Sequence, residues 1–287
     1  MTNADDAISV AELLEDYSLE MTGKDVPGLI EAHESIPPGT RVNVTFLGNE
    51  DMPMRVSAAA AVRSFRLTPV PHISARRLES EAELRKFLDS LVERAAVDSV
   101  LVVGGDPATP AGPYADSLAV IRSGVLAEYG ITKVGIGGYP EGHPDIRDEA
   151  LWQALTDKAR AVADVGHEVS VITQFGFDTG RVIEWVAGVR ARGIDATLRI
   201  GVPGPAGIRR LLSYAKRFGV ASSAGIARKY GFSLTNLLGT AGPDHFVRDL
   251  AAELPPAERE KVRLHFYTFG GLARTADWIA EFGASEP

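Results

Sequence analysis

Residues 99–105 read SVLVVGG, a run that is nearly all apolar before its two glycines. Continuous apolar runs of this length are typical of strands buried on both faces of a parallel sheet. Seven further β-rich runs are spread along the chain, and most of them are followed by a segment with helical character. They are residues 17–21 (YSLEM), 42–46 (VNVTF), 70–75 (VPHISA), 133–139 (KVGIGGY), 169–175 (VSVITQF), 197–202 (TLRIGV) and 263–269 (RLHFYTF).

The segments between these runs have the spacing of amphipathic helices. In residues 81–96, the side chains that recur at intervals of three and four are Leu84, Phe87, Leu88 and Leu91. Residues 149–165, 181–192 and 206–218 follow strands in the same style. Eight strands that alternate with helices predict an α/β fold, a (β/α)8 TIM barrel in a single domain over residues 1–287, with residues 1–15 as a short N-terminal extension. A doubly wound sheet is the alternative, because alternation alone does not say whether the sheet closes.

Composition excludes several classes of protein. The 287 residues are 45% hydrophobic and 24% charged, which is ordinary for a globular chain and excludes wholesale disorder. No cysteine occurs, so disulfides, thiolate catalysis and Cys-ligated metal centres are excluded. The net charge is -8 and no dense Lys/Arg run occurs, so we expect no nucleic-acid partner.

Familiar targeting and catalytic motifs are missing from the sequence as well. The first residues are polar and acidic, and no apolar stretch approaches the roughly 18 residues of a membrane span, so we expect a cytoplasmic protein with no membrane partner. The six histidines form no H-E-x-x-H pair, and no metal site is expected. No dinucleotide fingerprint, P-loop or G-x-S-x-G elbow is present.

In a barrel, catalytic residues lie at the carboxyl ends of the strands. Those ends carry Glu20, Thr45, His72, Gly104-Gly105-Asp106, Tyr139 with His143, Gln174 and Tyr267. Glu20 is either a solvated residue at the end of a strand or a general acid whose pKa is raised by burial. Gly105 and Asp106 form either a plain turn with a helix cap or a cradle for a ligand. His265 fits a satisfied core histidine.

Residues 138–144 read GYPEGHP, and residues 172–178 read ITQFGFD. These stretches resemble the Y-P-E-x-H-P and I-T-Q-x-x-F-D motifs of the methylenetetrahydrofolate reductase family. Weaker similarities occur in the family's order from about residue 17 to about residue 275. They are Tyr17-Ser18-Leu19-Glu20, Val44-Thr45, Pro71-His72-Ile73, Gly105-Asp106-Pro107, Tyr114-Ala115 and His265-Phe266-Tyr267-Thr268.

The resemblance implies an oxidoreductase of one-carbon metabolism and methionine biosynthesis. Such an enzyme holds FAD at the strand ends and interconverts 5,10-methylenetetrahydrofolate and 5-methyltetrahydrofolate, with NADH or NADPH as electron donor. Glu20 would be the general acid that helps to open the five-membered ring of the folate, and the implied folate contacts are Asp106, Gln174 and Tyr267. The implied FAD contacts are Thr45, His72, Gly105, Asp106, Tyr114, Ala115, Tyr139 and His143. A homo-oligomer is compatible with this resemblance.

Two positions that are cationic in the family are uncharged here. Gly104 stands where the family has Arg before Gly-Asp, and Val162 stands where it has Lys on the helix before the I-T-Q strand. Arg160 and Lys158, on other turns of that helix, are candidates to replace the Lys. We therefore expect FAD to bind loosely. Two alternatives stay open: a folate-binding barrel with weak or no flavin binding, and the same enzyme working in the direction of 5-methyltetrahydrofolate oxidation.

Overall fold

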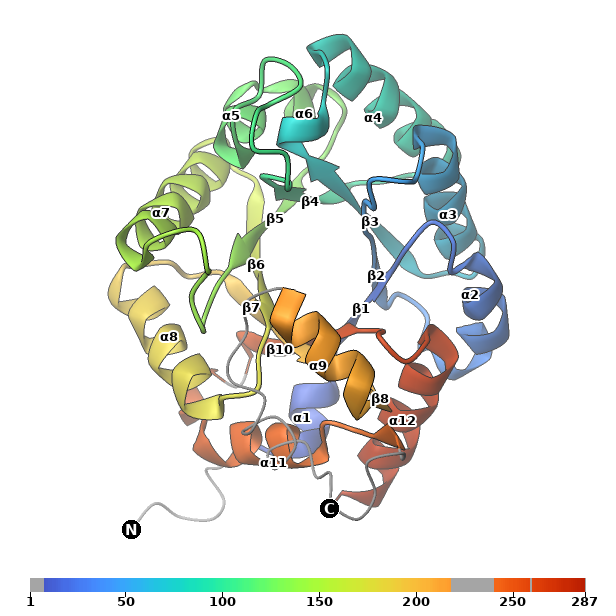
Figure 1. Cartoon of the computed structure of the whole chain (residues 1–287), viewed down its shortest axis with the longest axis vertical. Coiled ribbons are helices and arrows are strands. Elements are labelled where there is room, and N and C mark those ends of the chain that lie inside the picture. Colours follow the sequence, from blue (N-terminus) through green and yellow to red (C-terminus); the bar gives the residue numbers. More distant parts are fainter. Residues whose placement is uncertain (1–7, 218–239, 259, 287) are drawn as a thin grey trace.

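The computed structural model describes residues 8–217, 240–258 and 260–286, and in this part of the chain eight parallel strands close into a barrel (Figure 1). The strands adjoin in the order β1-β10-β7-β6-β5-β4-β3-β2. Their bounds are β1 Ser18–Met21, β2 Arg41–Val44, β3 Thr68–Ser74, β4 Ser99–Val103, β5 Lys133–Gly138, β6 Glu168–Phe175, β7 Thr197–Pro203 and β10 Val262–Tyr267. Each coincides with one of the eight expected runs to within two residues at either end. The TIM barrel is confirmed, and closure rules out the doubly wound sheet.

Helices surround the strands as an outer ring (Figure 1). Their bounds are α2 Val26–Ala32, α3 Met52–Ser64, α4 Glu81–Ala95, α5 Ser117–Arg122, α6 Val125–Glu128, α7 Asp148–Asp164, α8 Thr179–Ala191, α11 Asp244–Glu253 and α12 Leu272–Ser285. Short 3-10 turns are η2 His33–Ser35, η3 Ala75–Arg77 and η4 Pro256–Glu258. Across the described residues, none of these helices is long and apolar enough to cross a membrane.

The prediction of a helix over residues 206–218 is wrong at the first two residues. Residues 206 and 207 form the short strand β8 (Ala206–Gly207), which pairs antiparallel with β9 (Thr240–Ala241). The helix α9 (Ile208–Arg217) begins after it, and Phe218 lies outside the described residues. The helical pattern alone could not show this pairing, because β9 lies more than 30 residues further along the chain.

Side chains alternate between two cores along each strand. On β10, Leu264 and Phe266 are fully buried in the main core between the strands and the helices. Val70, Leu101 and Ile172, from β3, β4 and β6, form a separate cluster inside the barrel. At the amino-terminal end of the strands, the interior holds Arg199, which donates hydrogen bonds to the backbone and side-chain oxygens of Asp16 at 2.6 and 2.7 Å.

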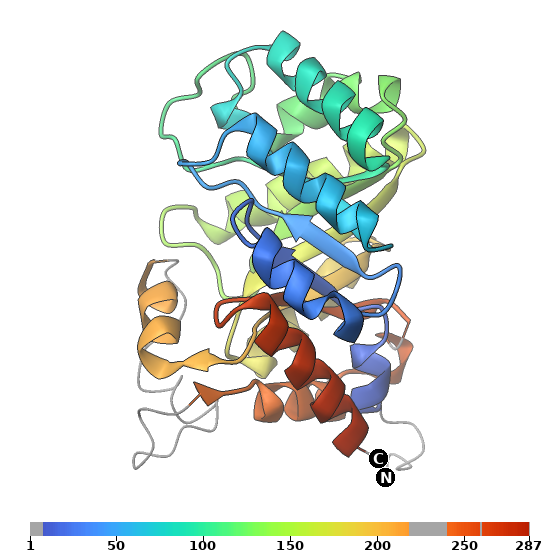
Figure 2. The same cartoon turned by 90° about the vertical axis from the view of Figure 1, so that its right-hand side faces the viewer.

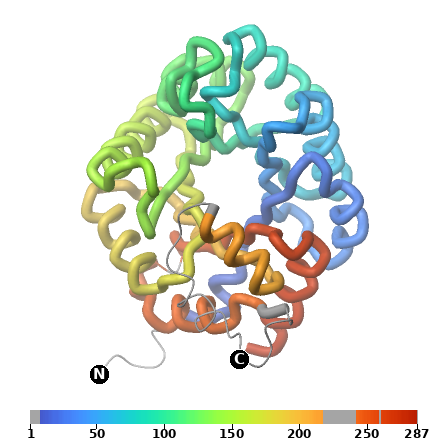
Figure 3. The backbone as a smooth tube through the Cα atoms, in the orientation of Figure 1, coloured from blue at the N-terminus to red at the C-terminus, as the bar shows by residue number. Residues whose placement is uncertain are grey.

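The two ends of the barrel are covered differently (Figures 2 and 3). The helix α1 (Val10–Leu14), within the expected N-terminal extension, buries Leu13 and Leu14 against the main core and packs on β10, α11 and α12. At the opposite end, α9 lies outside the helix ring, over the carboxyl ends of the strands (Figure 2). Its apolar face joins Phe175 and Phe177 in a third cluster. The residues at that carboxyl end, called the mouth of the barrel below, are described next.

Candidate active site

Glu20 projects into the barrel at its carboxyl end. Leu19 and Met21, its neighbours on β1, are buried in the outer core, so the alternation of the strand turns Glu20 inward. In the register of the sheet, Glu20 pairs with Tyr267 on β10 and with Asn43 on β2. Its side chain keeps 18% of its surface exposed, so the carboxyl group is enclosed by the barrel and still reachable from the mouth.

Two buried histidines from different strands face this carboxyl group. Oε2 of Glu20 lies 3.4 Å from Nε2 of His265 and 3.8 Å from Nε2 of His72. Nδ1 of His265 lies 2.9 Å from Oγ of Ser18, whose hydroxyl also has the backbone oxygen of Leu264 at 3.5 Å. A chain of polar atoms therefore runs from Ser18 through His265 to Glu20, inside the barrel.

His72 is held neutral by its surroundings. Its pKa is lowered from 6.5 to about 4, chiefly because the ring is buried; the nearby His265 and Arg55 also lower it, and Glu20 raises it. The guanidinium of Arg55 donates to the backbone oxygen of His72 at 3.5 Å and stacks on Phe46 and Phe87. A neutral His72 presents Glu20 with a dipole rather than with a positive charge that would favour the ionised carboxylate.

Two polar atoms beside Glu20 are buried without a hydrogen-bond partner among the described residues: Nε2 of His72 and Oδ1 of Asn43. Such groups are rare in folded proteins, because each one carries a desolvation cost. Asn43 is on β2, which borders β1, and His72 is on β3, which borders β2. The two atoms therefore lie in the same part of the mouth as Glu20. A polar ligand bound there would satisfy them.

The wall of the mouth opposite β2 comes from β10. The hydroxyl of Tyr267 donates to the backbone oxygen of Thr173 at 3.0 Å, and burial raises its pKa well above the usual value, with Glu20 adding to the shift. The hydroxyl of Thr268 donates to the backbone oxygen of Glu20 at 2.6 Å, which fixes the end of β1. The ring of Tyr267 packs edge-on against Phe175, so this wall is aromatic.

Asp106 lies on the loop after β4 and is largely exposed, with an ion pair to Arg77 at 2.9 Å. Gly105 before it has φ +88°, and a side chain there would collide with Oγ of Ser74. The guanidinium of Arg77 also lies 5.0 Å from the ring centre of Phe46. Asp106 is not the N-cap of any described helix, and its ion-pair partner Arg77 is the last residue of η3.

Glu141 ties the two most specific motifs of the sequence together. One of its oxygens, Oε1, accepts hydrogen bonds from the backbone amides of Phe177 at 2.6 Å and Asp178 at 3.0 Å. A side chain at Gly176 would approach that oxygen to 2.6 Å and would push the carboxylate out of its present position. The other oxygen, Oε2, is buried without a partner among the described residues. The GYPEGHP loop is thus pinned to the segment that follows Gln174.

The remaining expected cofactor contacts lie around the same rim. Thr45 follows β2 and donates its amide to the backbone of β1 at 2.9 Å. The rings of Tyr139 and His143 meet edge to face at 5.5 Å. Tyr114 is buried in the outer core, whereas Ala115 is exposed. Gln174 is the last residue but one of β6; it is half-buried and lies on the far side of β5 from Asp106.

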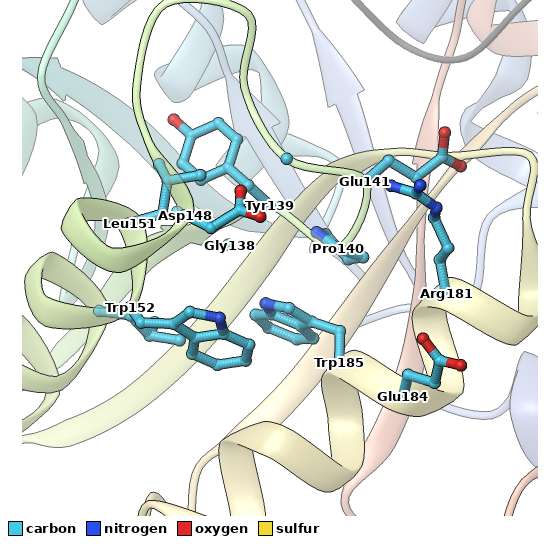
Figure 4. Close-up of a pocket in the computed structure, with 13 residues that line it drawn as sticks. Gly138, Tyr139, Pro140, Glu141, Asp148, Leu151, Trp152, Arg181, Glu184 and Trp185 are labelled. Atoms are coloured by element: carbon cyan, nitrogen blue, oxygen red, sulfur yellow. The ribbon is translucent and has the colours of Figure 1, made fainter.

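A separate pocket of about 310 Å³ lies between α7 and α8, beside the Tyr139–Gly142 turn (Figure 4). Trp152 and Trp185 stack in it with ring centres 5.9 Å apart, and the ring of Tyr139 points away from them. Trp185 also occupies the space that a side chain at Gly138 would need. Glu20 and His72 do not line this pocket, so it is distinct from the mouth.

Sequence reasoning missed the contribution of Ser18 and Arg77, and it took His265 for a core histidine, whereas the ring of His265 faces Glu20. The signal for His265 was available, since it alternates with Tyr267 and therefore shares its face of β10. Nothing local marked Arg77, because its meeting with Asp106 depends on how two loops fold. In the described part of the chain, no group of three His, Asp or Glu residues could hold a metal ion.

Two comparisons with known proteins identify the same family. The model of the methylenetetrahydrofolate reductase family matches residues 24–219, more than half of the chain. "Methylenetetrahydrofolate reductase 2" of Saccharomyces cerevisiae is 27% identical over 200 residues, which cover 63% of this chain and 32% of that protein. The chain thus spans about a third of the length of this curated relative.

Two solved structures are similar at low identity. One is a conserved protein of unknown function from Enterococcus faecalis, with a TM-score of 0.49, 10% identity and coverage of 94% of this chain and 65% of that one. The other is dihydropteroate synthase of Burkholderia cenocepacia, with a TM-score of 0.48, 13% identity and coverage of 93% and 90%. The family model, which covers β2 to β7 and the loops that carry Asp106, Glu141 and Gln174, is decisive: the chain belongs to the methylenetetrahydrofolate reductase family.

Proposed function

We propose that this protein interconverts 5,10-methylenetetrahydrofolate and 5-methyltetrahydrofolate, with FAD as cofactor and NADH or NADPH as the nucleotide partner. Family membership supports folate oxidoreductase chemistry. The observation that carries the proposal is the carboxyl group of Glu20, which lies at the mouth of the barrel with two buried imidazoles beside it. In the proposed reaction this carboxyl group would be the proton donor, at a position that a ligand can reach.

The residues present fit a flavin at this mouth. The buried, unpartnered Nε2 of His72 and Oδ1 of Asn43 would gain hydrogen-bond partners from a polar ring system. Gly105 brings bare backbone to the rim, where a planar ring can approach closely. Thr45, His72, Gly105, Asp106, Tyr139 and His143 would hold the cofactor, together with the Tyr114–Ala115 segment. When bound, FAD supplies the hydride that reduces the folate.

The protein's own contribution begins with a proton. In 5,10-methylenetetrahydrofolate one carbon bridges two nitrogens. When its bond to one of them breaks, that nitrogen takes the proton of Glu20, and the cationic carbon–nitrogen double bond left behind is the hydride acceptor. Asp106 and Gln174 would hold the pterin ring, because a carboxylate accepts hydrogen bonds and an amide both accepts and donates them. Tyr267 would close one side of the folate site with its ring.

His265 suits the protonated form of Glu20. If the hydroxyl of Ser18 donates to the backbone oxygen of Leu264, it accepts from Nδ1–H of His265, and Nε2 is left as an acceptor for the carboxyl proton. If the hydroxyl turns to donate to Nδ1, then Nε2–H donates to an ionised Glu20. Rotation of one hydroxyl therefore supports both states of the acid, which is what a reversible reaction requires.

A second candidate function is folate binding without flavin chemistry. It is favoured by the two missing cations: Gly104 has no side chain, and Val162, on α7, is fully buried in the apolar main core. The two candidates differ in one observable, the flavin. A protein that binds folate and shows no flavin absorption band even after FAD is added would support this second function.

The test is the spectrum of the purified protein. We expect a flavin absorption band that is bleached under anaerobic conditions by NADH or NADPH, and restored by 5,10-methylenetetrahydrofolate with formation of 5-methyltetrahydrofolate. The same mixture run from 5-methyltetrahydrofolate, with an artificial electron acceptor, measures the reverse direction. Failure of added FAD to bind the apo-protein would overturn the proposal.

A further inference from the structure

The pocket between α7 and α8 lies outside the mouth, and one side of it is a pair of tryptophans (Figure 4). Only 6% of Trp185 is exposed, and its ring occupies the space beside Gly138, where a side chain would come within 2.8 Å of it. Trp152 stacks on this ring, and the guanidinium of Arg192 lies over the Trp152 ring, 3.9 Å from its centre. The two indoles are therefore held in place by the protein itself, before any ligand binds.

Three hydrogen-bond donors that line this pocket have no acceptor among the described residues: the indole N–H of Trp152, the indole N–H of Trp185 and the guanidinium of Arg181. Figure 4 shows both indole nitrogens on the ring edges that face the Tyr139–Gly142 turn, and Arg181 reaching from α8 toward the same turn. A buried tryptophan usually donates its N–H to a partner. The N–H of Trp185 thus marks a place where a ligand would supply the acceptor.

The charges that line the pocket are mostly negative. Asp148 and Glu184 are both exposed, and within the described residues neither forms an ion pair. Glu141 adds its oxygen Oε2, which is buried without a partner there. Three carboxylates against the single guanidinium of Arg181 disfavour a ligand with several negative charges, such as a phosphate or a dinucleotide. They favour a ligand that carries a positive charge beside its acceptor group.

The rest of the lining is largely apolar. Pro140 comes from the turn after β5, and Leu151 and Leu155 come from successive turns of α7. The volume of about 310 Å³ is at the small end of ligand pockets, which begin at roughly 300 Å³. The pocket therefore suits one small molecule that has an apolar part and two opposite charges.

We propose that this pocket binds a free α-amino acid with an apolar side chain. Its carboxylate accepts hydrogen bonds from the indole N–H of Trp185 and from Arg181, its ammonium group lies beside the carboxylate of Glu184, and its side chain packs on the apolar lining. The two charges of the ligand thereby meet the two kinds of unpaired group that the pocket presents. The inference stands apart from the proposed function, because the acid and the histidines of the mouth do not line this pocket.

The experiment measures the binding of amino acids to the full chain by calorimetry and by intrinsic fluorescence. Two of the three tryptophans of the chain line the pocket, so a ligand there should change the emission. The probes are L-leucine, L-methionine and L-phenylalanine. Each is compared with its N-acetyl derivative, which lacks the positive charge, and with its amide, which lacks the negative charge.

Three variants locate the site. Arg181→Met removes the guanidinium, and Trp185→Phe keeps an aromatic ring and removes the N–H. The matched control is Arg192→Met, which removes another exposed cation of the same helix end, one that contacts Trp152 and does not line the pocket. Thermal unfolding of each variant is measured alongside.

We expect the amino acids to bind with a Kd below about 1 mM, and each derivative to bind roughly tenfold more weakly than its parent amino acid. Arg181→Met should weaken the binding by roughly tenfold and Trp185→Phe by about threefold, the ranges of a charge-assisted and of a neutral hydrogen bond. Arg192→Met should leave the affinity within about twofold. Because Arg181 is exposed, Arg181→Met should fold like the parent, and it decides the outcome if Trp185→Phe is unstable.

Three outcomes would overturn the inference: none of the three amino acids binds at millimolar concentration, the derivatives bind as tightly as the amino acids themselves, or Arg192→Met weakens binding as much as Arg181→Met does. The proposed function fails on a different result, the failure of FAD to bind. That result would leave the amino-acid site as it is.

Discussion

Nε2 of His72 lies 3.8 Å from Oε2 of Glu20, near enough for their charges to interact and too far for a hydrogen bond. Burial holds His72 neutral down to a pH of about 4, so at neutral pH Glu20 faces an uncharged ring. A cationic neighbour would favour the ionised carboxylate and weaken it as a proton donor. The depressed pKa of one residue therefore supports the acid function proposed for the other.

The same pKa predicts how stability depends on pH. In the unfolded chain His72 takes up a proton below its ordinary pKa of 6.5, whereas the folded protein resists protonation until about 4. The unfolded state therefore binds more protons than the folded state in this window. As the pH falls from 6.5 to 4, the free energy of unfolding decreases progressively through His72, by about 3 kcal/mol at most. Urea unfolding of the parent and of His72→Asn at pH 7 and pH 4.5 checks this, because the variant should lose less. Equal losses in both proteins would contradict the assignment.

Replacement of the acid should separate the two half-reactions. In Glu20→Gln the amide keeps the shape of the side chain and cannot give up the proton, so folate reduction should fall by about 10²–10⁴-fold. Reduction of the flavin by the nicotinamide nucleotide should stay close to the parent rate, since it needs no proton from Glu20. Stopped-flow measurement of each half-reaction gives both rates. Folate reduction at the parent rate would remove Glu20 from the mechanism.

Ser18 should act on the acid through His265. Ser18→Ala removes the oxygen that lies 2.9 Å from Nδ1, so the imidazole loses the partner that selects its tautomer. We expect the folate half-reaction to slow by roughly tenfold and its pH profile to move, with flavin reduction unchanged. Ser18→Thr, which restores a hydroxyl, should recover part of the rate. A fall in thermal stability with no change in the pH profile would instead mean that Ser18 only supports packing.

Sequence predicted the strands of this barrel better than the contents of its mouth. The run at residues 99–105 is apolar because β4 is buried on both faces, and the other strands follow the same rule. Closure depends on the pairing of Ser18 with His265, almost 250 residues apart, which no local pattern reveals. The ion pair of Arg77 with Asp106 was invisible for a similar reason, since it joins two loops. Glu20 and His72 were predictable because strand alternation and the barrel rule both place them at the mouth.

The two proposed pterin contacts should affect folate more than the nucleotide. Asp106→Asn and Gln174→Ala should each raise the KM for folate by roughly tenfold, because each removes a hydrogen bond to the pterin ring. Reduction of the flavin should stay nearly normal in both variants. The pair of Asp106 with Arg77 is exposed, so its loss should change stability by less than about 1 kcal/mol. Arg77→Ala is the control that breaks the ion pair and keeps the carboxylate. A uniform loss in both half-reactions that follows thermal stability would count against pterin binding.

Glu141 should matter for the position of the rim rather than for chemistry. In Glu141→Ala the amides of Phe177 and Asp178 lose their acceptor inside the protein, at a cost of about 1–3 kcal/mol, and the GYPEGHP loop is no longer tied to the end of β6. We expect weaker FAD binding and a higher KM for folate, with a smaller effect on kcat. Glu141→Gln keeps one carbonyl oxygen in place and should restore most of both affinities.

The matched control for Glu141 is Glu184→Ala, which removes an exposed carboxylate that lines the same pocket between α7 and α8. If Glu184→Ala weakens FAD as much as Glu141→Ala does, the effect is one of local charge and not of the tie between the loops. If Glu141→Gln fails to restore affinity while its stability is normal, the negative charge itself is required. Normal affinities in Glu141→Ala would show that the rim holds its shape without this contact, because the strands β5 and β6 alone would then position Tyr139 and Gln174.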